Sequence, residues 1–76
     1  MQKQTITINT DFIKLDQLLK FSGAADTGAM AKDMILSEMV YYNGEICTIR
    51  GKKVRSGDIV RIEFEDEDLE LTIEGN

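Results

Sequence analysis

The dipeptide Asn43-Gly44 constrains this sequence more than any other feature, because both residue types tolerate positive backbone φ angles. Residues 40–42 before it read Val-Tyr-Tyr, and residues 45–48 after it read Glu-Ile-Cys-Thr. Both segments are rich in the β-branched and aromatic residues that strands favour. A type I′ turn matches the twist of two antiparallel strands, so the stretch predicts a β-hairpin.

Three further strands are predicted from alternation of polar and apolar side chains. Residues 4–8 alternate near the N-terminus, with Ile6 and Ile8 facing inward. Residues 58–64 alternate again, and the apolar residues of 69–73 repeat the pattern. In residues 58–64 the inward side chains should be Val60, Ile62 and Phe64. The four acids between them predict a solvated turn in an acidic C-terminal hairpin of about residues 58–74.

A first helix is predicted from about Phe12 or Lys14 to Ser22. The polar residues 9–11 can cap its N-terminus, and Gly23 suits the left-handed residue at which helices commonly end. Its apolar side chains follow at helical spacing: Leu15, Leu18 and Leu19.

A second helix is predicted from about Gly28 to Glu38, with Thr27 as its N-cap. Its inward residues should be Ala31, Met34 and Ile35, and the small Ala31 allows close packing on the first helix. The expected fold is therefore α+β: two packed helices against a small, mainly antiparallel sheet, with a basic loop after the central hairpin.

Length and composition favour a binding module over an enzyme. With 76 residues, 42% of them hydrophobic and 30% charged, the chain should form one soluble domain over residues 1–76, too small for a deep catalytic cleft. It has no histidine, so the usual zinc, haem and Ser-His or Cys-His sites are not available. We expect no metal and no cofactor. No apolar run suits a signal peptide or a membrane span, which predicts a cytoplasmic protein.

The only cysteine, Cys47, cannot form an internal disulfide. We interpret it as a small buried strand residue in a reducing compartment. A reactive thiol is the minor alternative.

Charge is distributed unevenly along a chain whose net charge is -5. All nine lysines and arginines lie in residues 1–61, whereas seven of the fourteen acids lie in residues 62–76. Four cations fall within residues 50–57 with no acid among them: Arg50, Lys52, Lys53 and Arg55. Such a cluster on a glycine-bracketed loop suits a phosphate chain, and the alternative is a merely solvated charge run.

The start of the second helix is a second candidate for anion binding. A helix N-terminus presents unpaired N–H groups and partial positive charge, and Gly28 leaves it accessible. Thr27 would cap it, and Lys32 lies about one turn further on. Tyr41 is a candidate for stacking on an unpaired base, because it should point to the sheet face opposite Val40; simple packing is the alternative.

These features together resemble a known module. The matching positions are Leu15 with Leu18 and Leu19, Thr27-Gly28 with Ala31-Lys32 and Ile35, Val40, Asn43-Gly44-Glu45, and the run from Arg50 to Arg55 with Gly57-Asp58. From about residue 13 to 62 the chain resembles the RNA-binding domain first described in the small-subunit ribosomal protein numbered four, also called the alpha-L motif. More narrowly, it looks like the free-standing YaaA or YbcJ type.

The resemblance implies binding to structured RNA, commonly ribosomal RNA or a ribosomal particle. It implies an RNA site at the start of the second helix and in the loop after the hairpin, which here holds Thr27, Gly28, Lys32, Arg50, Lys52, Lys53 and Arg55. Two positions depart from many relatives. Met30 stands where they carry an acid, and Glu38 stands where a glycine ends their second helix.

Other functions compete with RNA binding. A small protein-interaction adaptor is the main alternative. A ubiquitin-like sulfur carrier needs a C-terminal Gly-Gly, whereas this sequence ends Glu74-Gly75-Asn76. A small hydrolase with paired carboxylates such as Glu65 and Glu67 has no sign of a pocket, so a solubilising turn is the better interpretation of these acids.

Overall fold

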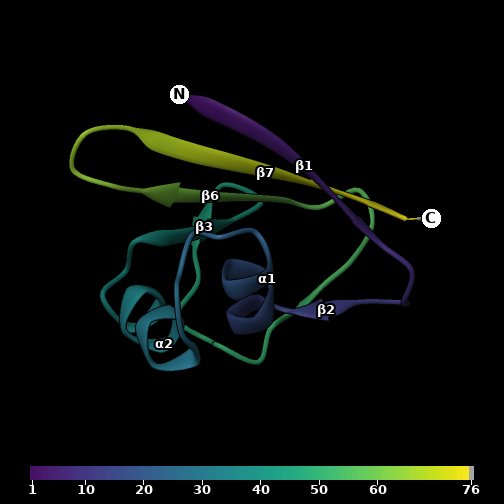
Figure 1. The fold of residues 1–76 in the computed structure, drawn as a ribbon, viewed down its shortest axis with the longest axis horizontal. Helices are drawn as coiled ribbons and strands as arrows, with labels where there is room; N and C mark the ends of the chain where they lie inside the picture. Colours follow the sequence, from purple (N-terminus) through teal and green to yellow (C-terminus); the bar gives the residue numbers. More distant parts are fainter. Residues whose placement is uncertain (76) are drawn as a thin grey trace.

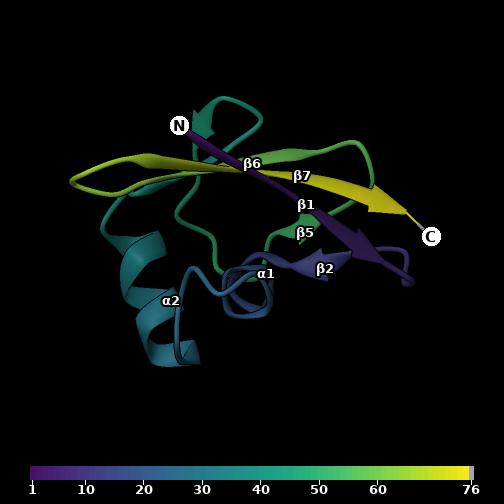
Figure 2. The ribbon, with the colours of Figure 1, turned by 45° about the horizontal axis from the view of Figure 1, so that its top comes forward.

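The computed structural model describes residues 1–75, which form a five-stranded sheet with two helices on one of its faces (Figure 1). The sheet contains β1 (Gln2–Ile8), β3 (Val40–Tyr42), β4 (Glu45–Ile46), β6 (Ile59–Glu63) and β7 (Asp68–Gly75). The helices are α1 (Leu15–Phe21) and α2 (Gly28–Leu36). A separate short pair, β2 (Ile13–Lys14) with β5 (Lys53–Val54), lies on the same side of the sheet as the helices (Figure 2). The expected α+β class is confirmed.

The strand order is β1-β7-β6-β3-β4, and every neighbouring pair is antiparallel except β1 and β7. Those two run parallel, so the first and last strands of the chain lie side by side. Ile6 is paired with Ile73, and Val60 with Leu71. These side chains are buried, which sets the register because a slip by one residue would turn them to the open face.

The core lies between the sheet and the helices. Its largest completely buried side chains come from both layers: Leu15, Leu18, Leu19, Ile35, Val40, Val54, Val60, Ile62, Leu71 and Ile73. The predicted inward residues Ala31 and Met34 of α2 are also buried. Phe64 is the exception, because β6 ends at Glu63 and the Phe64 side chain is exposed.

Helix α2 begins as predicted and ends earlier than predicted. The Thr27 hydroxyl accepts a hydrogen bond from the Met30 N–H at 3.1 Å. The helix stops at Leu36, and Glu38 adopts a φ of 63°. The Glu38 and Met39 N–H groups then donate to Ile35 and Met34, in the pattern of a Schellman end. Glu38 therefore has the left-handed conformation that glycine adopts most easily.

Helix α1 ends as predicted but begins differently. Gly23 has a φ of 85° and its N–H donates to Lys20. The helix begins at Leu15, one residue after the later of the two predicted starts, and the predicted capping by residues 9–11 is wrong. Ile13 and Lys14 are instead extended and pair with β5, and Lys14 occupies the N-cap position without a side-chain cap. This tertiary pairing overrides the local capping signal.

The central hairpin has the predicted turn. Asn43 and Gly44 both have positive φ, of 50° and 89°, as a type I′ turn requires. Strand β4 is shorter than predicted, because it ends at Ile46. Cys47 is thus neither in a strand nor fully buried, which corrects its interpretation; its thiol lies half-buried, 3.8 Å from the Ile49 carbonyl oxygen.

Within residues 1–75, neither helix is long and apolar enough to cross a membrane. The same residues contain no group of three or more cysteine or acidic side chains placed to hold a metal ion.

Candidate nucleic-acid interface

The basic loop, defined here as residues 50–55, is attached to the N-terminus of α1. The Leu15 N–H donates to the Lys52 carbonyl at 2.9 Å, and the Asp16 N–H donates to the Arg50 carbonyl at 3.0 Å. These bonds satisfy two of the N–H groups that a helix N-terminus leaves unpaired. The loop backbone is therefore held in place, with Val54 buried in the core while Arg50, Lys53 and Arg55 are exposed.

Asp58 fixes the other end of the loop. Its carboxylate accepts hydrogen bonds from the Tyr42 hydroxyl at 2.6 Å, the Arg55 N–H at 2.8 Å and the Asn43 amide at 3.2 Å. Partial burial raises the pKa of Asp58, but these three hydrogen bonds and the nearby Lys52 outweigh burial, so the pKa is lowered. The same hydrogen bond to Asp58 raises the pKa of Tyr42. Asp58 is consequently a carboxylate at neutral pH and connects the hairpin to the loop.

Gly57 allows the chain to turn back into the sheet after the basic loop. Its φ is 93°, and the Asp58 N–H donates to the Arg55 carbonyl across the turn. The Gly57 N–H donates to Ile73 of β7. This turn accounts for the Gly57-Asp58 pair noted in the sequence, since one residue supplies the backbone conformation and the other the acceptor.

Three loop cations lie over aromatic rings. The Lys52 ammonium is 4.9 Å from the centroid of the Tyr42 ring. The Lys53 ammonium and the Arg55 guanidinium lie 4.9 and 5.7 Å from the centroid of the Phe12 ring. Such contacts orient long side chains at little cost, because the cation keeps most of its hydration at an exposed site.

The loop cations also have no acidic partners. Among residues 1–75, no carboxylate lies within ion-pair distance of Arg50, Lys52, Lys53 or Arg55, whereas Arg61 is 2.8 Å from Glu63. Arg50, Lys53 and Arg55 are exposed and Lys52 is half-buried. Their charge is therefore available to an external anion.

The start of α2 is open, as its sequence predicts. Thr27, Gly28 and Lys32 are exposed, and a side chain added at Gly28 would meet nothing. No residue of the described part of the chain accepts a hydrogen bond from the N–H of Gly28 or Ala29. Within residues 1–75, no hydrogen bond or ion pair links this helix start to the basic loop. The structure thus places Lys53 and Arg55 over one ring, that of Phe12, and Lys52 over Tyr42, and it leaves the helix start as a separate element.

Sequence reasoning missed Phe12, Tyr42 and Asp58 as residues that organise the loop. Alternation predicted Tyr42 to be inward and drew attention to Tyr41, which lies on the open face of the sheet. There the Arg61 guanidinium is 4.2 Å from the Tyr41 ring, and the Tyr41 hydroxyl donates to Glu63 at 3.0 Å. That hydrogen bond raises the pKa of Tyr41. The ring and the hydroxyl of Tyr41 are thus both engaged by other residues of the protein, Arg61 and Glu63.

Comparison with known proteins agrees with this fold. Residues 6–72 match the family model described as S4 domain. The chain is 40% identical over 58 residues to the probable ribosome maturation protein RlbA of Bacillus subtilis (strain 168), a match that covers 76% of this chain and 82% of that protein.

The structure of Vibrio cholerae heat shock protein 15, described as trimeric, superimposes with a TM-score of 0.73 at 24% identity over 83% of this chain. The chain spans 63% of that protein, and the likeness supports the fold. The family match covers most of the sequence, and the chain belongs to the S4 domain family of RNA-binding modules.

Proposed function

We propose that this protein binds structured RNA, in particular ribosomal RNA or a ribosomal particle, through phosphate contacts and RNA shape. The contacting residues would be Thr27, Gly28, Lys32, Arg50, Lys52, Lys53 and Arg55. The observation that carries the proposal is the basic loop itself: its backbone is hydrogen-bonded to α1 and Asp58, while its four cations have no acidic partner in residues 1–75.

The loop would act as a preorganised phosphate surface. A fixed backbone lowers the entropy that is lost when the lysine and arginine side chains engage an anion. Each cation that neutralises a phosphate also releases counterions, which makes the affinity depend on salt. The protein would recognise the position of the phosphates and not the sequence of the bases at this surface.

The start of α2 would supply a second phosphate contact. The N–H groups of Gly28 and Ala29 point out of the first turn, where the helix dipole adds partial positive charge. Lys32 lies on the next turn of the same helix. Because this site and the basic loop lie on different elements, they would contact different phosphates of a folded RNA.

The ribosomal part of the proposal rests on the similarity to RlbA, whose name describes a probable ribosome maturation protein. A ribosomal partner would place this protein in the cytoplasm. The proposed role is binding without a chemical step. Crosslinking in cells followed by sequencing of the attached RNA would identify the partner, and recovery of protein partners alone would favour the adaptor function instead.

The site is tested by the double variant Lys52→Ala/Lys53→Ala. We expect weaker binding to a ribosomal RNA fragment. The slope of log affinity against log salt concentration should become less negative by about 0.7–0.9 for each phosphate that the variant no longer neutralises. The matched control is Lys3→Ala/Lys20→Ala, which removes the same charge from β1 and from the end of α1. Equal reductions of affinity and slope in the two variants would show that overall charge, and not this loop, determines binding.

A further inference from the structure

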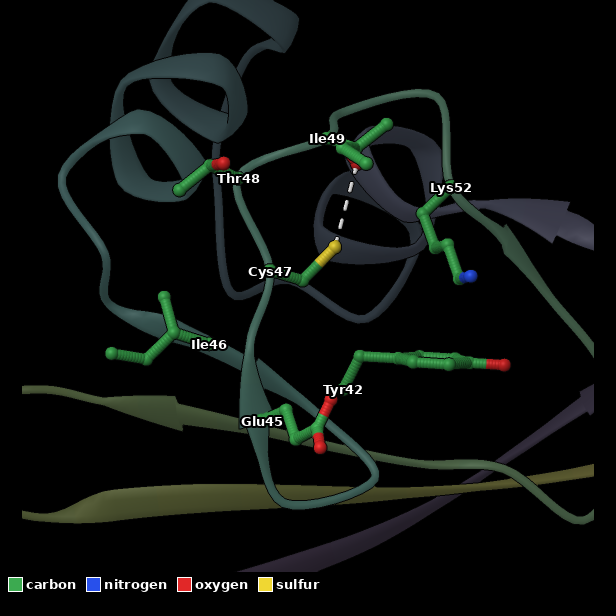
Figure 3. A pocket seen from close by; sticks show the side chains of 7 residues that line it. All are labelled: Tyr42, Glu45, Ile46, Cys47, Thr48, Ile49 and Lys52. Atoms are coloured by element: carbon green, nitrogen blue, oxygen red, sulfur yellow. Dashed lines mark hydrogen bonds between the residues drawn. The ribbon is translucent and has the colours of Figure 1, made fainter.

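An open hollow of about 260 Å³ lies between the β3–β4 hairpin and the basic loop (Figure 3). We call it the Tyr42 hollow. Its lining residues are Tyr42, Glu45, Ile46, Cys47, Thr48, Ile49 and Lys52. It is smaller than the roughly 300–1,000 Å³ pockets that hold drug-sized ligands, so it suits a single small planar group.

The Tyr42 ring is a fixed surface in this hollow. Its hydroxyl is held by Asp58 at 2.6 Å, and its half-buried ring packs against the core. Figure 3 shows the ring edge-on, with Cys47, Ile49 and Lys52 on one side of its plane and Glu45 on the other. A flat group that enters between Ile49 and the ring would therefore meet an aromatic face that is already oriented.

The lining offers a ligand apolar surface beside charged groups. The residues Ile46 and Ile49 are 49% and 64% exposed, so their apolar surface is available to a ligand. Glu45 is exposed and makes no ion pair with any described residue, so its carboxylate would repel an anion at this end. Aromatic and aliphatic side chains beside cations are the combination that holds an unpaired base next to its own phosphate.

Lys52 joins this hollow to the basic loop. Its ammonium lies over the Tyr42 ring, 4.9 Å from the centroid, in the space that a stacked base would occupy. The ammonium ends a flexible four-carbon stem, so it can leave the ring for a nearby phosphate when a base replaces it. Two interactions would then replace the original one, since the base would stack on the ring and the ammonium would bind the phosphate.

We propose that the Tyr42 hollow receives one unpaired base of the bound RNA, which stacks on Tyr42 while Lys52 turns to the adjoining phosphate. This inference rests on the proposed function and adds to it. It predicts that the protein prefers RNA with a bulged or looped-out nucleotide to a continuous duplex.

The absence of tryptophan provides a direct test. In Tyr41→Phe, Tyr42 is the only tyrosine, so its emission reports on the hollow alone. The probes are a short RNA hairpin with one unpaired adenosine and the same hairpin fully paired. We expect roughly tenfold tighter binding of the bulged hairpin, in the range of stacking one base, and quenching of Tyr42 emission by that hairpin only.

Two isoleucine variants separate the hollow from the rest of the surface. Ile49→Ala removes an exposed wall of the hollow and should reduce the preference for the bulged hairpin to about twofold or less, with the salt dependence unchanged. Ile59→Ala removes an exposed isoleucine of β6 that does not line the hollow, and should keep the preference.

The outcomes distinguish the two proposals. If both hairpins bind equally with the usual salt dependence and Tyr42 emission is unchanged, the base site is refuted and the phosphate-binding loop stands. If the bulged hairpin binds more tightly but leaves Tyr42 emission unchanged, the base does not enter this hollow and the inference is also refuted. If neither hairpin nor ribosomal RNA binds, both proposals fail together.

Discussion

Replacing Asp58 with alanine removes the acceptor of three hydrogen bonds at the end of the basic loop. The two shortest come from the Tyr42 hydroxyl and the Arg55 N–H. A hydrogen bond to a charged group contributes about 1.5–3 kcal/mol when it is well shielded from water. Because Asp58 is only partly buried, we take about half of that for each of the two bonds and expect a loss of about 1.5–3 kcal/mol.

The measurement is urea unfolding of wild type and Asp58→Ala at neutral pH. The midpoint should fall while the slope stays the same, since the surface exposed on unfolding is little changed. In a domain of this size each kcal/mol shifts Tm by about 4–8 °C, so thermal unfolding should show a drop of about 6–24 °C. A loss below about 0.5 kcal/mol would refute the role assigned to this carboxylate.

The pH dependence provides a second check. The pKa of Asp58 is lowered in the folded protein from its ordinary value of 3.8, so its charge stabilises the fold above that value. The contribution is lost as the pH falls through the folded-state pKa. The stability difference between wild type and Asp58→Asn should therefore be present at pH 7 and shrink in acid. A difference that is independent of pH would mean that side-chain shape, and not charge, matters at this position.

Three further results are expected. Lys32→Glu should weaken RNA binding more than Lys3→Glu in a fluorescence titration, and equal effects would argue against a site at the start of α2. Glu38→Gly should stabilise the protein by about 0.5–1 kcal/mol in urea unfolding, because Glu38 has a φ of 63°, and a destabilised variant would contradict this reasoning. Replacing the acids at 65–68 by their amides should tighten binding to unrelated RNA at low salt if these acids repel it; falling solubility with unchanged binding would assign them to solubility alone.

The local features of the fold could be predicted because each depends on a few adjacent residues. Thr27 caps α2, Gly23 ends α1, and Asn43-Gly44 forms the hairpin turn, all through short-range hydrogen bonds and backbone preferences. The basic loop could also be identified from the sequence, because its four cations lie within a few adjacent residues.

The long-range features could not be predicted in the same way. Pairing of Ile13 with Val54 replaces the expected start of the first helix, and it depends on two segments far apart in sequence. The assembly around Asp58 likewise joins the hairpin to the loop through side chains. The sequence pointed to Tyr41 as the base-stacking candidate, whereas the hollow lies beside Tyr42. Alternation assigns side chains to the two faces of the sheet, but it does not show which face carries a hollow.

The parallel pairing of β1 with β7 has a consequence for the order in which the protein folds. In the sheet, β7 lies between β1 and β6, so β1 pairs with no described strand other than β7. On a translating ribosome, β1 emerges first and has no partner strand until β7 has left the exit tunnel. Ile6 and Ile8 lack their β7 neighbours Ile73 and Gly75 for that time, and the five-stranded sheet is complete only after synthesis of the whole domain. Any RNA-binding surface that depends on the complete five-stranded sheet therefore forms after translation of the domain and not during it.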